Sequence, residues 1–224
     1  MTTPRTVAAV FPDWAPLNNA ILIDEPGSLT ASVAAVELRH LYRSAGVASW
    51  ALWVPASTPS LNGSDRLAGV GGMRRDATTL VMRLTLGQPS SEPDGVVRTS
   101  VAAAGQAGDE PVSALDLPLP DGGTVMDAWV MVRDGLAVAG AWSLIAGTDC
   151  GLYAVATAPG WRRRGLARAL MQGVLGDAYR RGARTASLQS TPMGEPLYTS
   201  LGFDPVGRYE EWVPADGLDR ERQE

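Results

Sequence analysis

The alternation of apolar and polar residues is clearest between residues 125 and 213. Two apolar runs, at 125–133 and 136–145, flank Asp134-Gly135, which is the commonest two-residue hairpin signal. A third apolar run covers 151–158. Three strands in series with short connections predict an antiparallel meander.

The period of the pattern changes after residue 164. Apolar residues then recur every four positions, as on one face of a helix over 165–181, and Gly182 is placed to end that helix. The residues of this face are Leu166, Leu170, Val174 and Ala178, with Gly173 as a small packing point. The remaining predicted elements are a strand at 185–189, a short helix at 195–201 and a closing strand at 206–213.

The first 86 residues carry a shorter pattern. Residues 29–44 place apolar side chains on one face, with Gly46 as a C-terminal cap, and predict an amphipathic helix. Apolar runs at 49–54 and 79–84 predict two strands. We therefore expect a small helix-and-strand layer at 1–86, either an N-terminal extension or a degenerate half-domain.

The two patterned regions are joined by residues 87–124, which are rich in Gly, Pro, Ser and Asp. A short strand at 96–101 is predicted within them. We expect a loop-rich connection at 87–124, a core domain at 125–214 and a polar tail at 215–224.

Composition narrows the class of protein. Of the 224 residues, 45% are hydrophobic and 19% are charged, which is the range of globular domains. The net charge of -5 argues against a general affinity for nucleic acid, because that affinity needs a positive surface. The single cysteine, Cys150, excludes an intramolecular disulfide and a thiolate zinc cluster, so we expect no metal.

No segment resembles a signal peptide, and no window holds the roughly 20 apolar residues that a membrane helix needs. We therefore expect a cytoplasmic protein without a membrane partner.

The residues that carry chemistry lie where the third strand passes into the helix. The run Arg162-Arg163-Arg164-Gly165-Leu166-Ala167, followed by Arg168, gathers four arginines around a glycine in an acidic chain. Amides at a helix start are unpaired, the helix dipole favours an anion, and glycine permits close approach. The turn predicts an anion cradle suited to a diphosphate. The alternative is a solvated basic turn ahead of an ordinary helix.

Two spaced motifs favour the cradle. The basic run resembles the acetyl-CoA-binding motif of the GNAT superfamily of N-acetyltransferases, Gln/Arg-x-x-Gly-x-Gly/Ala, and it follows a strand that ends in Val155-x-x-x-Pro159. The run from Tyr198 to Phe203 is similar to the Tyr-x-x-Leu-Gly-Phe element of the same superfamily. The resemblance covers 125–213, and residues 1–86 resemble less closely the N-terminal extension of a bacterial GNAT subgroup.

This resemblance implies an α/β (α+β) fold with a mixed, mainly antiparallel sheet flanked by helices. The strands at 151–158 and 185–189 would splay apart, and the pantetheine of acetyl-CoA or another acyl-CoA would lie in the gap. Carried over position by position, coenzyme A binding falls to Val155, Thr157, Arg162, Arg163, Arg164, Gly165, Leu166, Ala167, Arg168 and Gln189.

The resemblance also implies a general acid but leaves the base open. Tyr198 has a phenol with an ordinary pKa of about 10, so it is protonated at neutral pH and can donate to a departing thiolate. The alternative role for Tyr198 is packing against Phe203.

Many GNAT enzymes carry a glutamate on the strand that corresponds to 151–158, but this strand has no carboxylate. Either water relays the proton to Asp127, Asp149 or Glu195, or the amine arrives already neutral. His40, the sole histidine, lies in the N-terminal helix, where a surface role is favoured over a role as base.

Aromatic residues of the meander offer a wall for the acceptor. Trp129, Trp142 and Tyr153 come from the three successive strands. They could surround a small amine, or they could pack in the core.

These features predict an N-acyltransferase that moves an acetyl or other acyl group from acyl-CoA to a small-molecule amine by direct attack on the thioester. Three alternatives stay open: delivery of the acyl group by an acyl carrier protein, a CoA-binding sensor without catalysis, and an acidic scaffold. The sequence also leaves open whether the chain forms a homodimer.

Overall fold

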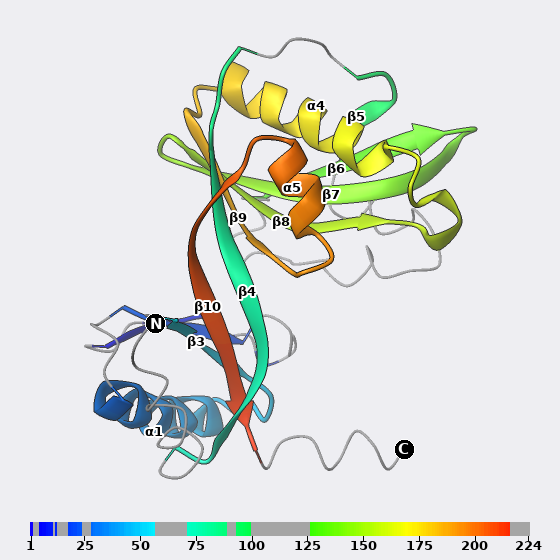
Figure 1. Cartoon of the computed structure of the whole chain (residues 1–224). Helices are drawn as coiled ribbons and strands as arrows, with labels where there is room; N and C mark the ends of the chain where they lie inside the picture. The colour runs from blue at the N-terminus through cyan, green and yellow to red at the C-terminus, as the bar shows by residue number, and fades with distance from the viewer. Residues whose placement is uncertain are drawn as a thin grey trace. The chain divides into compact units, whose positions relative to one another are not determined.

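The computed structural model describes residues 1, 5–10, 12, 18–23, 28–56, 71–88, 93–99 and 126–215 (Figure 1). The chain forms two compact units. Unit 1 comprises Met1–Leu80 and Gly207–Glu224, and unit 2 comprises Val81–Val206. This division differs from the sequence-based boundary at residue 86, because the last strand groups with the N-terminal residues and Val81 onward groups with the core domain.

Unit 1 is a sheet with one helix. Its strands lie in the order β1-β2-β3-β10-β4. Their bounds are β1 Thr6–Ala8, β2 Asn19–Leu22, β3 Ala51–Pro55, β4 Met73–Thr85 and β10 Asp204–Pro214, and the helix is α1 Ser28–Ser44. β2 and β3 run parallel, as a connection through a helix permits. Strands β1 and β2 are too short to leave a periodic pattern, and the sequence did not predict them.

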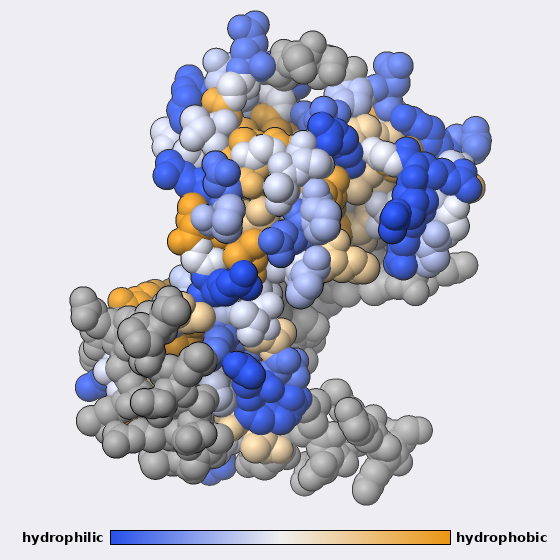
Figure 2. Space-filling model, viewed as in Figure 1, coloured by the Kyte–Doolittle hydropathy of each residue, from blue (hydrophilic) through white to orange (hydrophobic). Residues whose placement is uncertain are grey.

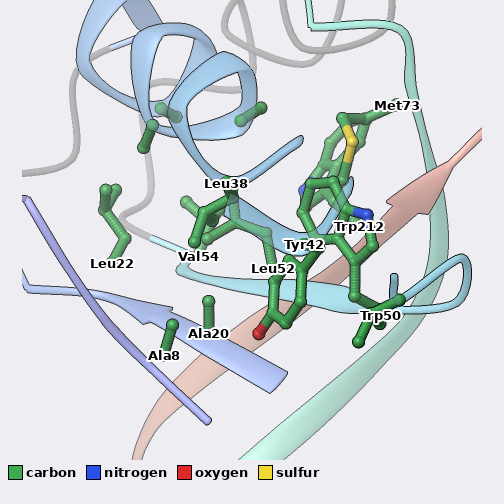
Figure 3. Close-up of a cluster of buried hydrophobic side chains, with 14 residues drawn as sticks. Ala8, Ala20, Leu22, Leu38, Tyr42, Trp50, Leu52, Val54, Met73 and Trp212 are labelled. Carbon is green, nitrogen blue, oxygen red and sulfur yellow. The ribbon is translucent and has the colours of Figure 1, made fainter. Parts of the chain in front are cut away.

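The core of unit 1 lies between α1 and the sheet. Buried side chains from α1 meet those of β2 and β3 around Leu38 and Leu52, both fully buried (Figure 3). The Tyr42 ring stacks on Trp50 with centroids 5.0 Å apart, and its hydroxyl donates to the Ala9 carbonyl at 2.8 Å. The predicted helix-and-strand layer is therefore a packed structure of its own.

Unit 2 contains the predicted meander. Its strands follow the order β4-β9-β8-β7-β6-β5, and Asp134-Gly135 turns β6 into β7 as predicted. The bounds are β5 Val96–Thr99, β6 Asp127–Arg133, β7 Leu136–Ala146, β8 Asp149–Thr157 and β9 Thr185–Ser190. The helices are a single 3-10 turn, η4 Pro159–Trp161, then α4 Leu166–Arg180 and α5 Glu195–Ser200. The sheet is mixed and mainly antiparallel, so the predicted fold class is confirmed.

Helix α4 crosses one face of this sheet (Figure 1). A side chain on Gly173 of α4 would collide with Val96, which pairs with Met131, so Trp129 and Met131 lie on the face covered by α4. Ala128, Val130 and Trp142 pack together on the opposite face. The two faces of the sheet therefore carry different sets of side chains.

None of the helices in the described ranges has the length and apolar character to cross a membrane.

Candidate functional site

Strand β8 is irregular at the point where it leaves β9. Its parallel ladder with β9 ends at the pair Leu152–Leu188, although β8 continues to Thr157. Ala154 has φ 49°, and Ala154 and Val155 together stand opposite a single residue of β7. A bulge of this kind bends a strand and ends its pairing. The strands at 151–158 and 185–189 thus stop pairing within their length, where the sequence expectation places the gap.

The turn between β8 and α4 presents backbone amides. Arg163 and Gly165 both have left-handed backbones, with φ 64° and φ 78°, on either side of Arg164. Within the described residues, no hydrogen bond engages the amides from Arg163 to Arg168; the first helical bond runs from the Ala169 amide to the Gly165 carbonyl. The first turn of α4 contains no acidic residue. Alternating left-handed residues ahead of a helix form a concave anion-binding site.

The arginine side chains around this turn are mostly held by their own chain. Arg162 donates from Nε to the Thr157 carbonyl at 3.0 Å, and Arg164 stacks on the Trp161 ring at 5.0 Å. Arg168 donates to Ser200 Oγ of α5 at 2.8 Å. Hydrophilic surface gathers over this turn in Figure 2. The amides and Arg163, which is exposed, are therefore the groups most available to an anion.

Arg168 also borders a cavity of about 260 Å³ between the end of β4, α4 and α5. Its lining mixes Leu84 and Leu86 of the β4 end with Gln172 of α4 and Ser200 of α5. The arginine thus joins the first turn of α4 to α5.

Tyr198 lies in α5 beside the end of β9. Its side chain is buried, its ring meets Phe203 edge-on at 5.9 Å, and a Cβ atom added to Gly194 would touch both the Tyr198 ring and Ser190 Oγ. Burial raises the pKa of Tyr198 to about 12. No described residue forms a hydrogen bond with its hydroxyl. Tyr198 therefore packs against Phe203, and its role as the general acid stays a prediction.

The three aromatic residues proposed for the acceptor wall differ in exposure. Trp129 and Trp142 are buried at 5% and 1% exposure, as core packing requires, whereas Tyr153 is 47% exposed. Trp129 donates to Ser143 Oγ at 2.9 Å, but the Trp142 indole N–H has no partner among the described residues. Tyr153 is the one of the three that faces solvent.

The carboxylates named as proton acceptors differ in their positions and in the groups that contact them. Asp127 is engaged by Arg181 and Arg98, in a group that includes Asp177 at the end of α4. Glu195 begins α5. Asp149 instead accepts hydroxyl hydrogen bonds from Thr185 and Ser187. His40 is exposed on α1 in unit 1.

The remaining expected site residues are Gln189, which is exposed in β9 just past the end of the ladder, and Leu166 and Ala167, which open α4. In the described ranges, no group of three or more His, Cys, Asp or Glu side chains could hold a metal ion. Sequence reasoning missed the left-handed backbones of Ala154 and Arg163. Neither residue type favours that conformation, so only the folded backbone reveals them.

Comparison with known proteins identifies the domain. Residues 125–214 match the family model described as an acetyltransferase (GNAT) domain. Among curated proteins, no sequence matches the chain significantly. The match covers both sequence motifs, so it supports the resemblance to the GNAT superfamily of acetyltransferases over residues 125–214.

Solved structures share the fold at low sequence identity. A GCN5-related N-acetyltransferase from Kribbella flavida aligns with TM-score 0.68 and 20% identity over 97% of this chain and 91% of its own. A functionally unknown conserved protein from Staphylococcus epidermidis aligns with TM-score 0.67 and 9% identity over 96% and 92%. A GCN5-related N-acetyltransferase from Sphaerobacter thermophilus aligns with TM-score 0.58 and 20% identity over 87% and 71%. These likenesses show the fold, and the family match supports acyl transfer as its general chemistry.

Proposed function

We propose that the protein transfers an acetyl or other acyl group from acyl-CoA to the amine of a small-molecule acceptor. The observation that carries this proposal is the turn from Arg163 to Arg168, where unpaired amides and two left-handed residues open α4 next to a strand that has left its ladder. The amides fit a diphosphate, and the unpaired edge of β8 beyond Leu152 fits the amide groups of pantetheine.

The chemistry is direct transfer. The neutral amine nitrogen bonds to the thioester carbonyl carbon, the carbon–sulfur bond breaks, and the thiolate takes a proton. The nitrogen loses one proton to water, and water returns one proton to the group that protonated the thiolate. We assign the supply of the thiolate's proton to Tyr198, whose phenol is protonated at neutral pH because burial raises the pKa of Tyr198 to about 12. Val155 and Thr157 lie on the free part of β8, and Gln189 lies on the corresponding part of β9.

A titration of the full chain tests the donor. CoA should bind with micromolar affinity, on the order of -8 kcal/mol, and pantetheine, which lacks the diphosphate, should bind at least about a hundredfold more weakly. Equal affinities for the two ligands would contradict the assigned cradle. Release of free thiol from acetyl-CoA with a panel of amines then tests transfer.

Two alternatives have distinct outcomes in the same experiment. A sensor would bind CoA and turn over no amine in the panel. A carrier-protein donor is favoured by one observation, the exposed side chains of Arg162, Arg163 and Arg164, which an acidic helix could contact. That donor would give a higher kcat/KM with an acylated carrier protein than with the same acyl-CoA.

A further inference from the structure

Asp149 is a carboxylate held in place by hydroxyl groups. It is the first residue of β8, and its two oxygens each accept one hydrogen bond from β9, from Thr185 Oγ1 and from Ser187 Oγ, both at 2.5 Å. Hydroxyl donors on both oxygens fix the orientation of a carboxylate. The structure therefore builds a rigid negative charge at this point.

This charge is not paired with a cation among the described residues. No arginine or lysine pairs with Asp149 in the part of the chain that the structure describes, whereas Asp127 on the other face contacts Arg181 and Arg98. The side chain of Asp149 is only partly buried, so a ligand can reach it. A fixed, accessible and unpaired carboxylate is suited to bind an ammonium group.

Asp149 shares its face of the sheet with Tyr153. Tyr153 pairs with Trp142, so both lie on the face opposite α4, and Asp149 and Gly151 follow on the same face by the strand period of two. The Tyr153 side chain lies back over Gly151, since a Cβ atom there would be 2.7 Å from the Tyr153 hydroxyl oxygen. An exposed aromatic ring thus lies between the carboxylate and the end of the ladder, and such a ring also attracts cations.

The distance between Asp149 and the proposed reaction centre sets the size of the ligand. Asp149 is three residues from Leu152, where the β8–β9 ladder ends, which is about 10 Å along a strand. The carboxylate leans toward Ser187, level with Gly151, which shortens that separation. A short alkyl chain spans it.

We propose that Asp149 binds a second ammonium group of the acceptor, so that the acceptor is an α,ω-diamine or another amine that carries a second positive charge. The inference rests on the proposed function, because it places the reacting amine at the end of the ladder. Tyr153 contacts the alkyl chain between the two amino groups, and the distal ammonium stays charged while the other amine reacts as the neutral base.

Direct binding of two probes tests this assignment without requiring turnover. Cadaverine and pentylamine, which differ by one amino group, are titrated into the full chain by calorimetry, with and without CoA. Cadaverine should bind at least tenfold more tightly than pentylamine. Asp149→Asn should abolish this preference, and Ser187→Ala, which removes one hydroxyl donor, should reduce it severalfold.

A matched control separates the site from net charge. Asp134→Asn removes the same charge from the exposed β6–β7 turn, where asparagine tolerates the left-handed backbone, and should leave the preference intact. Equal binding of the two probes, or a preference that survives in folded Asp149→Asn, would overturn the inference. Failure of the proposed function is recognised separately, as absence of CoA binding in the wild-type chain.

Discussion

The two units differ in which residue types adopt a positive φ. In the described part of unit 1, residues with positive φ are glycines, Gly46 and Gly72. Unit 2 places three other residue types there, of which Asp134 belongs to an ordinary hairpin turn. The other two, Ala154 and Arg163, flank the proposed coenzyme A site, one in the β8 bulge and one before α4.

Residues held in that region cost on the order of 1 kcal/mol or more, and they persist where the surrounding structure imposes them. Unit 1 uses its residues for a packed core around Leu38, Tyr42 and Leu52. Unit 2 has two such residues outside the hairpin turn, Ala154 and Arg163. The contrast supports the proposal that ligand binding falls in unit 2.

The largest effect is expected from Gly165→Val. A β-branched residue opposes φ 78°, and its side chain would stand beside the amides that face the diphosphate. CoA affinity should fall at least about a hundredfold, or about 3 kcal/mol, measured by calorimetry.

Gly182→Val is the matched control for that substitution. Gly182 lies beyond the other end of α4 with φ 101°, and an added Cβ at either glycine meets no atom within 4 Å. The control should lower the melting temperature and leave CoA affinity unchanged. Equal loss of CoA affinity in the two variants would show that the effect of Gly165→Val comes from stability.

Tyr198→Phe should lower turnover by roughly tenfold to a thousandfold, because one general acid is removed. CoA affinity should change little, since the ring still packs against Phe203. The measurement is kcat under conditions where chemistry limits the rate. Unchanged turnover would reduce Tyr198 to a packing residue.

Tyr42→Phe makes the corresponding change in unit 1. It removes the hydrogen bond to the Ala9 carbonyl and should cost about 1 kcal/mol of stability at pH 8, with turnover unaffected. Chemical denaturation followed by tryptophan fluorescence measures the difference. A drop in turnover comparable to that of Tyr198→Phe would contradict a purely structural role for Tyr42 in unit 1.

The same variant has a pH signature. Burial raises the pKa of Tyr42 to about 12, so its contribution to stability is complete below the ordinary phenol pKa of about 10 and is lost as the pH rises through 12. The stability gap between parent and Tyr42→Phe should therefore narrow between pH 10 and 12. A constant gap would contradict the burial of this phenol.

The smallest effect is expected from Trp142→Phe. Loss of apolar area is offset by removal of a buried N–H that has no partner among the described residues, so stability should change by less than about 1 kcal/mol. Trp129→Phe should cost about 1 kcal/mol more, because it leaves Ser143 without its donor. Equal costs in denaturation would show that the Trp142 indole finds a partner in solution.

Local patterns were enough to predict α4, the Asp134-Gly135 hairpin and the basic turn. Each depends on residues within one or two turns of each other, and the predicted helix at 165–181 is α4 at 166–180. The two GNAT motifs likewise lie in short continuous runs. The strand predicted at 79–84 extends back to Met73 in the structure, where polar residues interrupt its apolar pattern.

Tertiary structure decided what depends on residues far apart in the sequence. β10 pairs with β3, about 150 residues earlier, and Asp149 finds its hydroxyl donors 36 and 38 residues later. Apolar periodicity could not separate buried Trp142 from exposed Tyr153, because both side chains lie on the same face of the sheet and their exposure depends on their positions on that face. Composition and period determine which elements form, while register between distant strands decides which polar groups remain free to bind a ligand.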